Sequence, residues 1–391
     1  MQKKLEKIVG FGINNLKPEI TLYQRDGQQT KEIKNEFFPF LIADEKIEQY
    51  LDDKIKSELI SISHLELPDE IKRKKDEFYT ALLVFKNPAS LNDSYKWLRE
   101  KAPDFLDRAY DVITQYQFVT GQKMYQNMSF AELKRLQLDI LHYDSQKFRI
   151  VCKADNYTYP ITKNRFQDLA EIFFAFVQDK NPDVIEVYNL EQTLGVLAEE
   201  ADAFEMPLML GRDANSQSQA RYTGRNAASS RFHIRRHLPK IDINGREAID
   251  VYLAAYRFNK DMQAFKRLNL INFRDYFDID KKLPFVNVLD FISKYTMQSS
   301  FLITQIAPLR LQGTYRIGIA NIIDHMLLEA YLSRGMAVPK PRAYSPIKGG
   351  LTEIYFKGIE NDVHKMDVKE MYPSITETYG LFLSKAYLLS D

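Results

Sequence analysis

The sequence predicts a multidomain protein of mixed α/β and α+β class, and three observations support this. The chain has 391 residues, which is too long for one ordinary hydrophobic core, so two to three domains are expected. Short β-rich runs alternate with stretches whose apolar residues recur at helical spacing. In two separate regions the order is strand, helix, strand, which is typical of sheets covered by helices.

The composition excludes several classes of protein. Hydrophobic residues make up 45% and charged residues 27% of the chain, as in ordinary globular proteins. The 54 Lys and Arg residues nearly balance the 53 Asp and Glu residues, so a DNA-binding surface would have to come from local clustering. Cys152 is the only cysteine, and neither a secretory signal nor a membrane-spanning run occurs. A cytoplasmic location is therefore expected.

An N-terminal α+β domain is expected over residues 1–133. Residues 7–43 alternate short apolar runs with polar ones and indicate strands separated by turns. A β-rich run at 79–85 precedes a helix expected from Ser90 to Lys101. Another β-rich run at 109–113 then predicts a returning strand, which completes a small strand–helix–strand unit.

A second domain, of mixed α/β type, is expected over residues 134–338. Residues 136–141 have the apolar character of a buried strand. Residues 162–179 indicate an amphipathic helix, because their apolar side chains recur on one face. Residues 184–188 then indicate the next strand, and an amphipathic helix is expected over residues 320–334.

A basic segment at 221–246 is the best local candidate for contact with nucleic acid. It carries seven basic residues and one acid. The candidate DNA-binding residues are Arg221, Arg225, Arg231, Arg235, Arg236 and Lys240. Aromatic and histidine side chains lie between the arginines and would stack on single-stranded bases. The alternative is a long surface loop or hairpin whose charges only face water, and the sequence leaves both interpretations open.

Residues 367–375 read Asp-Val-Lys-Glu-Met-Tyr-Pro-Ser-Ile and resemble motif A of family B DNA polymerases, Asp-x-x-Ser-Leu-Tyr-Pro-Ser-Ile. The resemblance extends upstream, because residues 316–341 are similar to the helix and proline-rich link that lead into the palm of archaeal-type members. Residues 347–350 stand where the family has Tyr-x-Gly-Gly, with Ile347 in place of the tyrosine. Earlier segments are similar in the family's order: residues 37–43, 79–133 and 180–189.

The resemblance implies a fold in three parts. The N-terminal α+β domain would be followed by an RNase H-like (DnaQ-like) exonuclease-type domain over 134–338. The start of a polymerase palm would occupy 339–391. The chain would then correspond to the N-terminal portion of such an enzyme, ending just after motif A.

Motif A implies a half of the polymerase site. By resemblance, Asp367 is the catalytic residue that binds both metal ions, Mg²⁺ in a two-metal site, and the carbonyl of Val368 coordinates one of them. The backbone amides of Glu370 and Met371 would contact the triphosphate of the incoming dNTP, and Tyr372 would pack under its sugar. The alternative is a strand and turn retained without catalytic duty.

One position departs from motif A. Glu370 replaces the family's serine, and a carboxylate beside a triphosphate is repulsive unless it turns away or meets a cation. Lys365 and Lys369 are close enough in sequence to compensate. The effect of Glu370 on dNTP binding is left open by the sequence.

The family places the carboxylates of its 3′–5′ exonuclease in three motifs, and this sequence has lost most of them. Proofreading needs about four carboxylates that hold two metal ions. Asp139 remains in the first motif, but Leu141 replaces its glutamate. Leu194 replaces the aspartate of the second, and Tyr295 and Ser299 match the third, with serine in place of aspartate. The resemblance is therefore to an exonuclease-degenerate branch, without proofreading. Neighbouring acids are less favoured as substitute ligands: Asp144, Glu186, Glu191 and Asp290.

The expected function is that of the N-terminal half of a split family B DNA polymerase. The family's fingers helix, its Asp-Thr-Asp motif C and its thumb do not occur in the sequence, and one aspartate cannot support a two-metal transfer. A second polypeptide would supply these parts. The other partners of this chain would be dNTP and DNA, the latter as a primer–template or a single strand. The alternative is a non-catalytic DNA-binding or scaffold protein. A replication role and a repair role both stay open.

Overall fold

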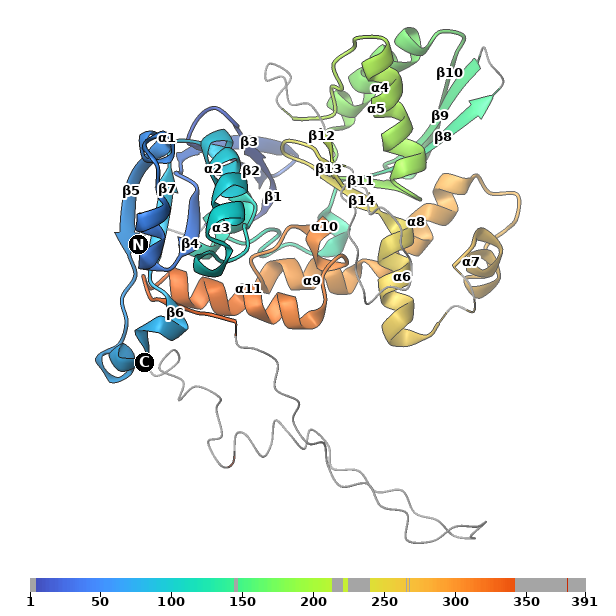
Figure 1. The fold of residues 1–391 in the computed structure, drawn as a ribbon. Coiled ribbons are helices and arrows are strands. Elements are labelled where there is room, and N and C mark those ends of the chain that lie inside the picture. Colours follow the sequence, from blue (N-terminus) through green and yellow to red (C-terminus); the bar gives the residue numbers. More distant parts are fainter. Residues whose placement is uncertain are drawn as a thin grey trace, which may run out of the picture.

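The computed structural model describes residues 5–143, 147–212, 221–223, 240–264, 266, 268–341 and 378. Within this part the chain forms several sheets covered by helices (Figure 1), which confirms the predicted multidomain, mixed α/β class. The predicted palm, apart from residues 339–341 and 378, lies outside the described residues. The domain boundaries drawn from the sequence stay predictions.

The N-terminal part begins with an antiparallel sheet in the order β1-β2-β3. Its strands are β1 (Ile8–Ile13), β2 (Glu19–Asp26) and β3 (Gln29–Glu36). Ile20 and Leu22 are fully buried, whereas β3 is polar and exposed, so only one face packs on a core. The two-residue connection between β2 and β3 begins at Gly27, whose φ of 57° suits a tight hairpin.

A second antiparallel sheet of the N-terminal part has the order β4-β7-β5 and packs against helix α2. Asn87 caps this helix by accepting a 2.9 Å hydrogen bond from the amide of Ser90, and Pro88 occupies its first turn, so the helix starts two residues before the predicted Ser90. The elements are β4 (Phe40–Ala43), β5 (Leu59–His64), β7 (Ala81–Phe85), α1 (Asp53–Glu58) and α2 (Pro88–Lys101).

The strand predicted at 109–113 is wrong. Residues 112–120 form helix α3 (Val112–Thr120), which ends at Gly121 with φ of 67°. Asp111 caps this helix, since its carboxylate accepts 3.1 Å and 2.7 Å hydrogen bonds from the amide and hydroxyl of Thr114. The β-branched residues that suggested a strand are instead buried on a helix, because the cap and tertiary packing outweigh local propensity.

The second large sheet has the order β10-β9-β8-β11-β14. Neighbouring strands β10, β9 and β8 are antiparallel, while β8, β11 and β14 run parallel to one another. The strands are β8 (Arg135–Tyr143), β9 (Lys147–Ala154), β10 (Tyr157–Lys163), β11 (Val184–Val187) and β14 (Glu247–Asp250). This order agrees with the RNase H-like arrangement that the resemblance implied.

Helices cover both faces of this sheet (Figure 1). On one face, Leu136 and Leu138 of β8 join a core with α4 (Phe166–Lys180) and α5 (Val196–Ala203). On the other face lie α6 (Val251–Met262) and α8 (Phe285–Thr296), whose apolar residues share a core with β1 and β2. The sheet β1-β2-β3, called the N-terminal sheet below, and the five-stranded sheet, called the large sheet, therefore share one continuous hydrophobic core.

The remaining elements return the chain to the N-terminal part. The elements are α7 (Leu270–Tyr276), α9 (Gln298–Ile306), α10 (Leu311–Thr314), α11 (Ile319–Leu332), β6 (Phe78–Tyr79) and β15 (Val338–Pro339). Helix α11 matches the helix predicted at 320–334. It runs beneath the N-terminal sheets in Figure 1, where Leu328 and Leu332 pack with Phe40 and Phe118, and β15 pairs with β6. No helix in the described part of the chain is long and apolar enough to cross a membrane.

Candidate functional site

Asp139 lies at the carboxyl edge of the parallel strands, where open α/β sheets commonly place their sites. Leu138 is the register partner of Val187, the last residue of β11, so Asp139 is level with Tyr188. The Asp139 carboxyl is half-buried. Burial raises its pKa, and the positive charge of Arg149 on β9 offsets that rise only in part.

The positions that would complete a metal site hold no oxygen ligand. Leu141 lies two residues further along β8, opposite Arg149 in the register. Leu194 sits in a π-helical turn, Glu191–Gly195, after β11, where it is fully buried in the apolar core. A guanidinium next to Asp139 also repels divalent cations. In the described part of the chain, no group of three or more His, Cys, Asp or Glu side chains gathers where an ion would bind.

The residues assigned to the third motif from the sequence lie on α8 and α9. Phe285 contacts Tyr188 edge to face, with ring centroids 5.6 Å apart, so α8 begins level with Asp139. By Asp290 the helix has reached Arg135, the first residue of β8, at 2.9 Å. Helix α8 therefore runs from the carboxyl edge of the parallel strands toward the amino end of β8.

Tyr295 and Ser299 differ in their surroundings. The hydroxyl of Tyr295 is 3.0 Å from that of Tyr276, and its ring contacts Phe258 and Phe277. Ser299 is exposed on α9. These contacts place Tyr295 against α6 and the segment after α7, and the assignment of Tyr295 and Ser299 to the third motif stays a prediction.

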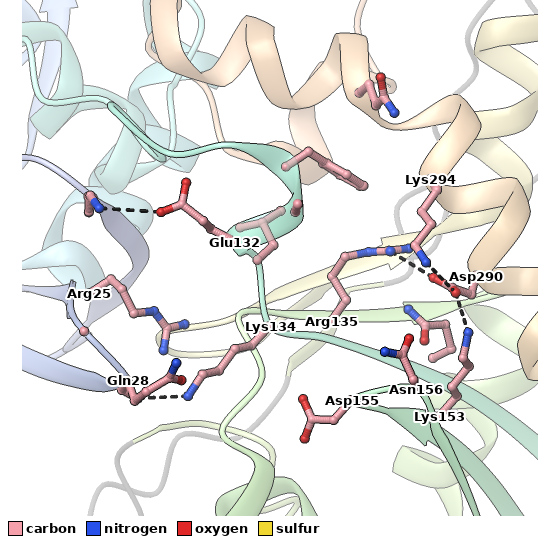
Figure 2. A pocket seen from close by; sticks show the side chains of 17 residues that line it. Arg25, Gln28, Glu132, Lys134, Arg135, Lys153, Asp155, Asn156, Asp290 and Lys294 are labelled. Carbon is pink, nitrogen blue, oxygen red and sulfur yellow. Dashed lines mark hydrogen bonds and ion pairs between the residues drawn. The ribbon is translucent and has the colours of Figure 1, made fainter.

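Two of the acids considered as substitute ligands are held by cations instead. Arg135 donates two hydrogen bonds to Glu186, at 2.7 Å and 2.8 Å, and Gln137 donates a third at 2.8 Å. Asp290 accepts from Arg135, from Lys294 at 2.9 Å and from Lys153. Figure 2 shows Arg135, Lys153 and Lys294 converging on Asp290. This buried polar layer lies at the amino end of β8 and is structural.

The polar layer predicts an acid-dependent stability. Burial disfavours the Asp290 carboxylate, but hydrogen bonds from Lys153 and Lys294 and the charge of Arg135 outweigh it and hold its pKa below the ordinary value of 3.8. A lowered folded-state pKa stabilises the protein above pH 3.8, and this contribution is lost as the pH falls through the folded-state value. We expect Asp290→Asn to cost about 2 kcal/mol at pH 7. Thermal unfolding followed by circular dichroism measures the difference in stability between Asp290→Asn and wild type. This difference should disappear below pH 3.8, and a difference that is constant with pH would contradict the prediction.

The basic segment is described only at its base. Arg221 lies on β12 (Arg221–Thr223) and Lys240 on β13 (Lys240–Asp242), and these short strands pair antiparallel, as a hairpin requires. Asp242 accepts a 2.7 Å hydrogen bond from Arg310, which also binds Glu247 on β14 at 2.7 Å. The base is thus anchored to the sheet. The other candidates lie outside the described residues: Arg225, Arg231, Arg235 and Arg236.

The polymerase motif also lies outside the described residues. Its candidates are Asp367, Val368, Glu370, Met371 and Tyr372. Their roles and the Mg²⁺ site stay predictions.

A buried charge cluster surrounds Asp183, and no pattern in the sequence predicted it. Arg25 of β2 and Arg212 both donate to its fully buried carboxylate, and the amide of Lys134 donates at 3.0 Å. Arg246 lies alongside and is saturated by acceptors that include the carbonyl of Pro182 at 3.0 Å. Burial lowers the pKa of Arg246 to about 9, and the charge of Arg212 acts in the same direction. The cluster joins the N-terminal sheet to the large sheet.

Comparison with solved structures gives a context for this geometry. The chain is similar to the family B DNA polymerase from the hyperthermophilic archaeon Pyrobaculum calidifontis, with a TM-score of 0.58 and 14% sequence identity. The match covers 88% of this chain and 53% of the polymerase, so the chain spans about half the length of that enzyme. No model of a known protein family matches the sequence, and no curated protein matches it. At this identity the likeness shows the fold: the chain has the fold of a family B DNA polymerase over about half of that enzyme's length.

Proposed function

We propose that this chain is the N-terminal part of a family B-type DNA polymerase that has lost proofreading. We further propose that it supports template-directed DNA synthesis only with a second polypeptide that supplies the fingers, the second catalytic aspartate and the thumb. The observation that carries the proposal is the structural match over 88% of the chain, together with a motif A sequence at residues 367–375.

In this proposal the chain contributes one half of the reaction site. The carboxylate of Asp367 and the carbonyl of Val368 are hard oxygen donors of the kind that suit Mg²⁺. When bound, the two ions would activate the primer 3′-hydroxyl and neutralise charge on the transferred phosphoryl group. The amides of Glu370 and Met371 would orient the triphosphate, and Tyr372 would position the sugar.

Primer extension tests the synthetic half of the proposal. The chain is assayed alone and with a polypeptide that carries the Asp-Thr-Asp motif and thumb, using a primer–template, dNTPs and Mg²⁺. Extension only in the mixture supports the proposal. Extension by the chain alone would refute the need for a partner. DNA binding without extension in either sample would point instead to a non-catalytic DNA-binding or scaffold protein.

Loss of proofreading is tested separately. The purified chain should not degrade 5′-labelled single-stranded DNA in Mg²⁺. Leu141 and Leu194 supply no metal ligand, and the positive charge of Arg149 near Asp139 disfavours a bound cation. Asp139→Ala should leave this baseline unchanged. Mg²⁺-dependent degradation that disappears in Asp139→Ala would show that the site is functional. A polymerase that cannot excise misincorporated nucleotides would suit repair or bypass synthesis. An error rate equal to that of proofreading enzymes would argue against this role.

A further inference from the structure

A cavity of about 850 Å³ lies between the N-terminal sheet and the large sheet. Its walls come from the β2–β3 turn, the segment that leads into β8, the β9–β10 turn and α8, as Figure 2 shows. Its volume is within the range of small-molecule sites. It lies at the amino end of β8, so it is separate from the carboxyl edge of the parallel strands, where Asp139 lies.

The cavity wall carries more positive than negative charge. Among the described residues, six cationic and three acidic side chains line it. Two of the acids are already engaged: Asp290 binds the cations of the polar layer, and Glu132 accepts from the amide of Ser129 at 2.6 Å and pairs with Lys7 at 3.5 Å. The third, Asp155, is exposed on the β9–β10 turn.

Two cations of this wall have no carboxylate of their own, because Arg25 shares Asp183 with Arg212 and Lys134 makes no ion pair in the described structure. Arg25 is 9% exposed and binds Asp183 through Nη2 only, while its Nε and Nη1 have no hydrogen-bond partner among the described residues. Its guanidinium points toward Lys134 and the middle of the cavity in Figure 2. In the described structure the Lys134 ammonium makes a 2.9 Å hydrogen bond to the carbonyl of Gln28 and no ion pair. Because Arg212 shares the same Asp183 carboxylate, local positive charge exceeds negative charge.

The electrostatics of Lys134 are consistent with this excess. Burial lowers its pKa, and the charges of Arg25 and Arg212 lower it further, while Asp183 and Asp155 act in the opposite direction. Nε and Nη1 of Arg25 are buried in the wall, so Arg25 acts through its positive charge. The exposed ammonium of Lys134 is the donor that an anion in the cavity can reach. A phosphate group offers several acceptor oxygens and negative charge, which match an ammonium and a guanidinium.

We propose that this cavity binds a phosphate ester anion, with the phosphate held by Lys134 beside Arg25. The source would be either a single-stranded nucleic acid or a free nucleotide, since both present the same group. This site is additional to the polymerase motif and to the basic segment at 221–246, and does not depend on DNA synthesis.

The test is binding of fluorescein-labelled dT12 to the full chain by fluorescence anisotropy, with dAMP, ATP and inorganic phosphate as unlabelled competitors. Lys134→Glu should weaken binding about tenfold or more. It should also reduce the slope of log affinity against log salt concentration by about one, as expected for the loss of one phosphate contact. Gln28→Glu, an exposed position of the wall, should also weaken it without removing a buried cation. The matched controls are Lys101→Glu and Gln49→Glu, which make the same charge changes on exposed positions outside the cavity wall.

The competitors distinguish the sources. Displacement of dT12 by ATP or dAMP at comparable concentration would identify a nucleotide site, and displacement only by unlabelled oligonucleotide would identify a single-strand site. Equal affinity of the cavity variants and their controls for every probe would overturn the proposal, as would no measurable binding of any probe. Primer extension is not part of the readout, so failure of the polymerase proposal would leave the result interpretable.

Discussion

Replacing Asp367 by alanine should reduce primer extension by the complemented chain about a thousandfold or more. In the proposed function Asp367 would help to hold the two metal ions, and removing a ligand of a two-metal site would forfeit several kcal/mol of transition-state stabilisation. The loss should appear in the maximal rate, because template and primer binding do not depend on this carboxylate. Single-turnover extension with saturating dNTP measures it.

The matched control for this experiment is Asp362→Ala. It removes a carboxylate five residues earlier in the same segment, so it reports any general effect on the segment. It should retain near wild-type extension. Comparable losses in both variants, or activity retained in Asp367→Ala, would contradict the assignment of motif A.

The second large effect concerns stability. We expect Asp183→Asn to lower the free energy of unfolding by about 3–5 kcal/mol, because it removes the carboxylate from a buried ion cluster and leaves cations uncompensated. Asp183 is fully buried and accepts from Arg25, Arg212 and the amide of Lys134. Urea denaturation followed by far-ultraviolet circular dichroism measures the change.

Asp179→Asn is the control for the buried cluster. This variant makes the same change from carboxylate to amide four residues earlier in the chain. The side chain of Asp179, however, is 74% exposed and pairs with Lys180 at 3.5 Å. It should change stability by no more than about 0.5 kcal/mol. If both variants unfold at the same urea concentration, the Asp183 cluster does not contribute as proposed.

Local patterns predicted several of the regular elements. The strand expected at 136–141 appears within β8, because its apolar residues have the character of a buried strand. The helix expected at 162–179 appears as α4, but it begins at Phe166, since residues 162 and 163 belong to β10. The run at 109–113 failed, since β-branched residues also occur in buried helices. An aspartate cap at Asp111, followed three residues later by Thr114, is the signal that would have corrected it.

The candidate site was predicted unevenly. Leu141 and Leu194 could be judged from identity alone, since an apolar side chain cannot bind a metal ion wherever the fold places it. Tyr295 and Ser299 could not, because their match depends on spacing alone, and the structure places Tyr295 beside Phe258 and Phe277. The polar layer of Arg135, Glu186 and Asp290 was likewise invisible in the sequence.

The sequence by itself determined the mixed α/β class of this protein, several of its strands and helices, and the resemblance to polymerase motif A. These depend on residue identity and on periods of a few residues. Only the tertiary structure decided where Asp183 meets Arg25, 158 residues apart in the chain, and that a positively charged cavity lies beside them. The physical reason is that buried charge pairing and cavities arise from packing distant segments, and no local pattern encodes which segments meet.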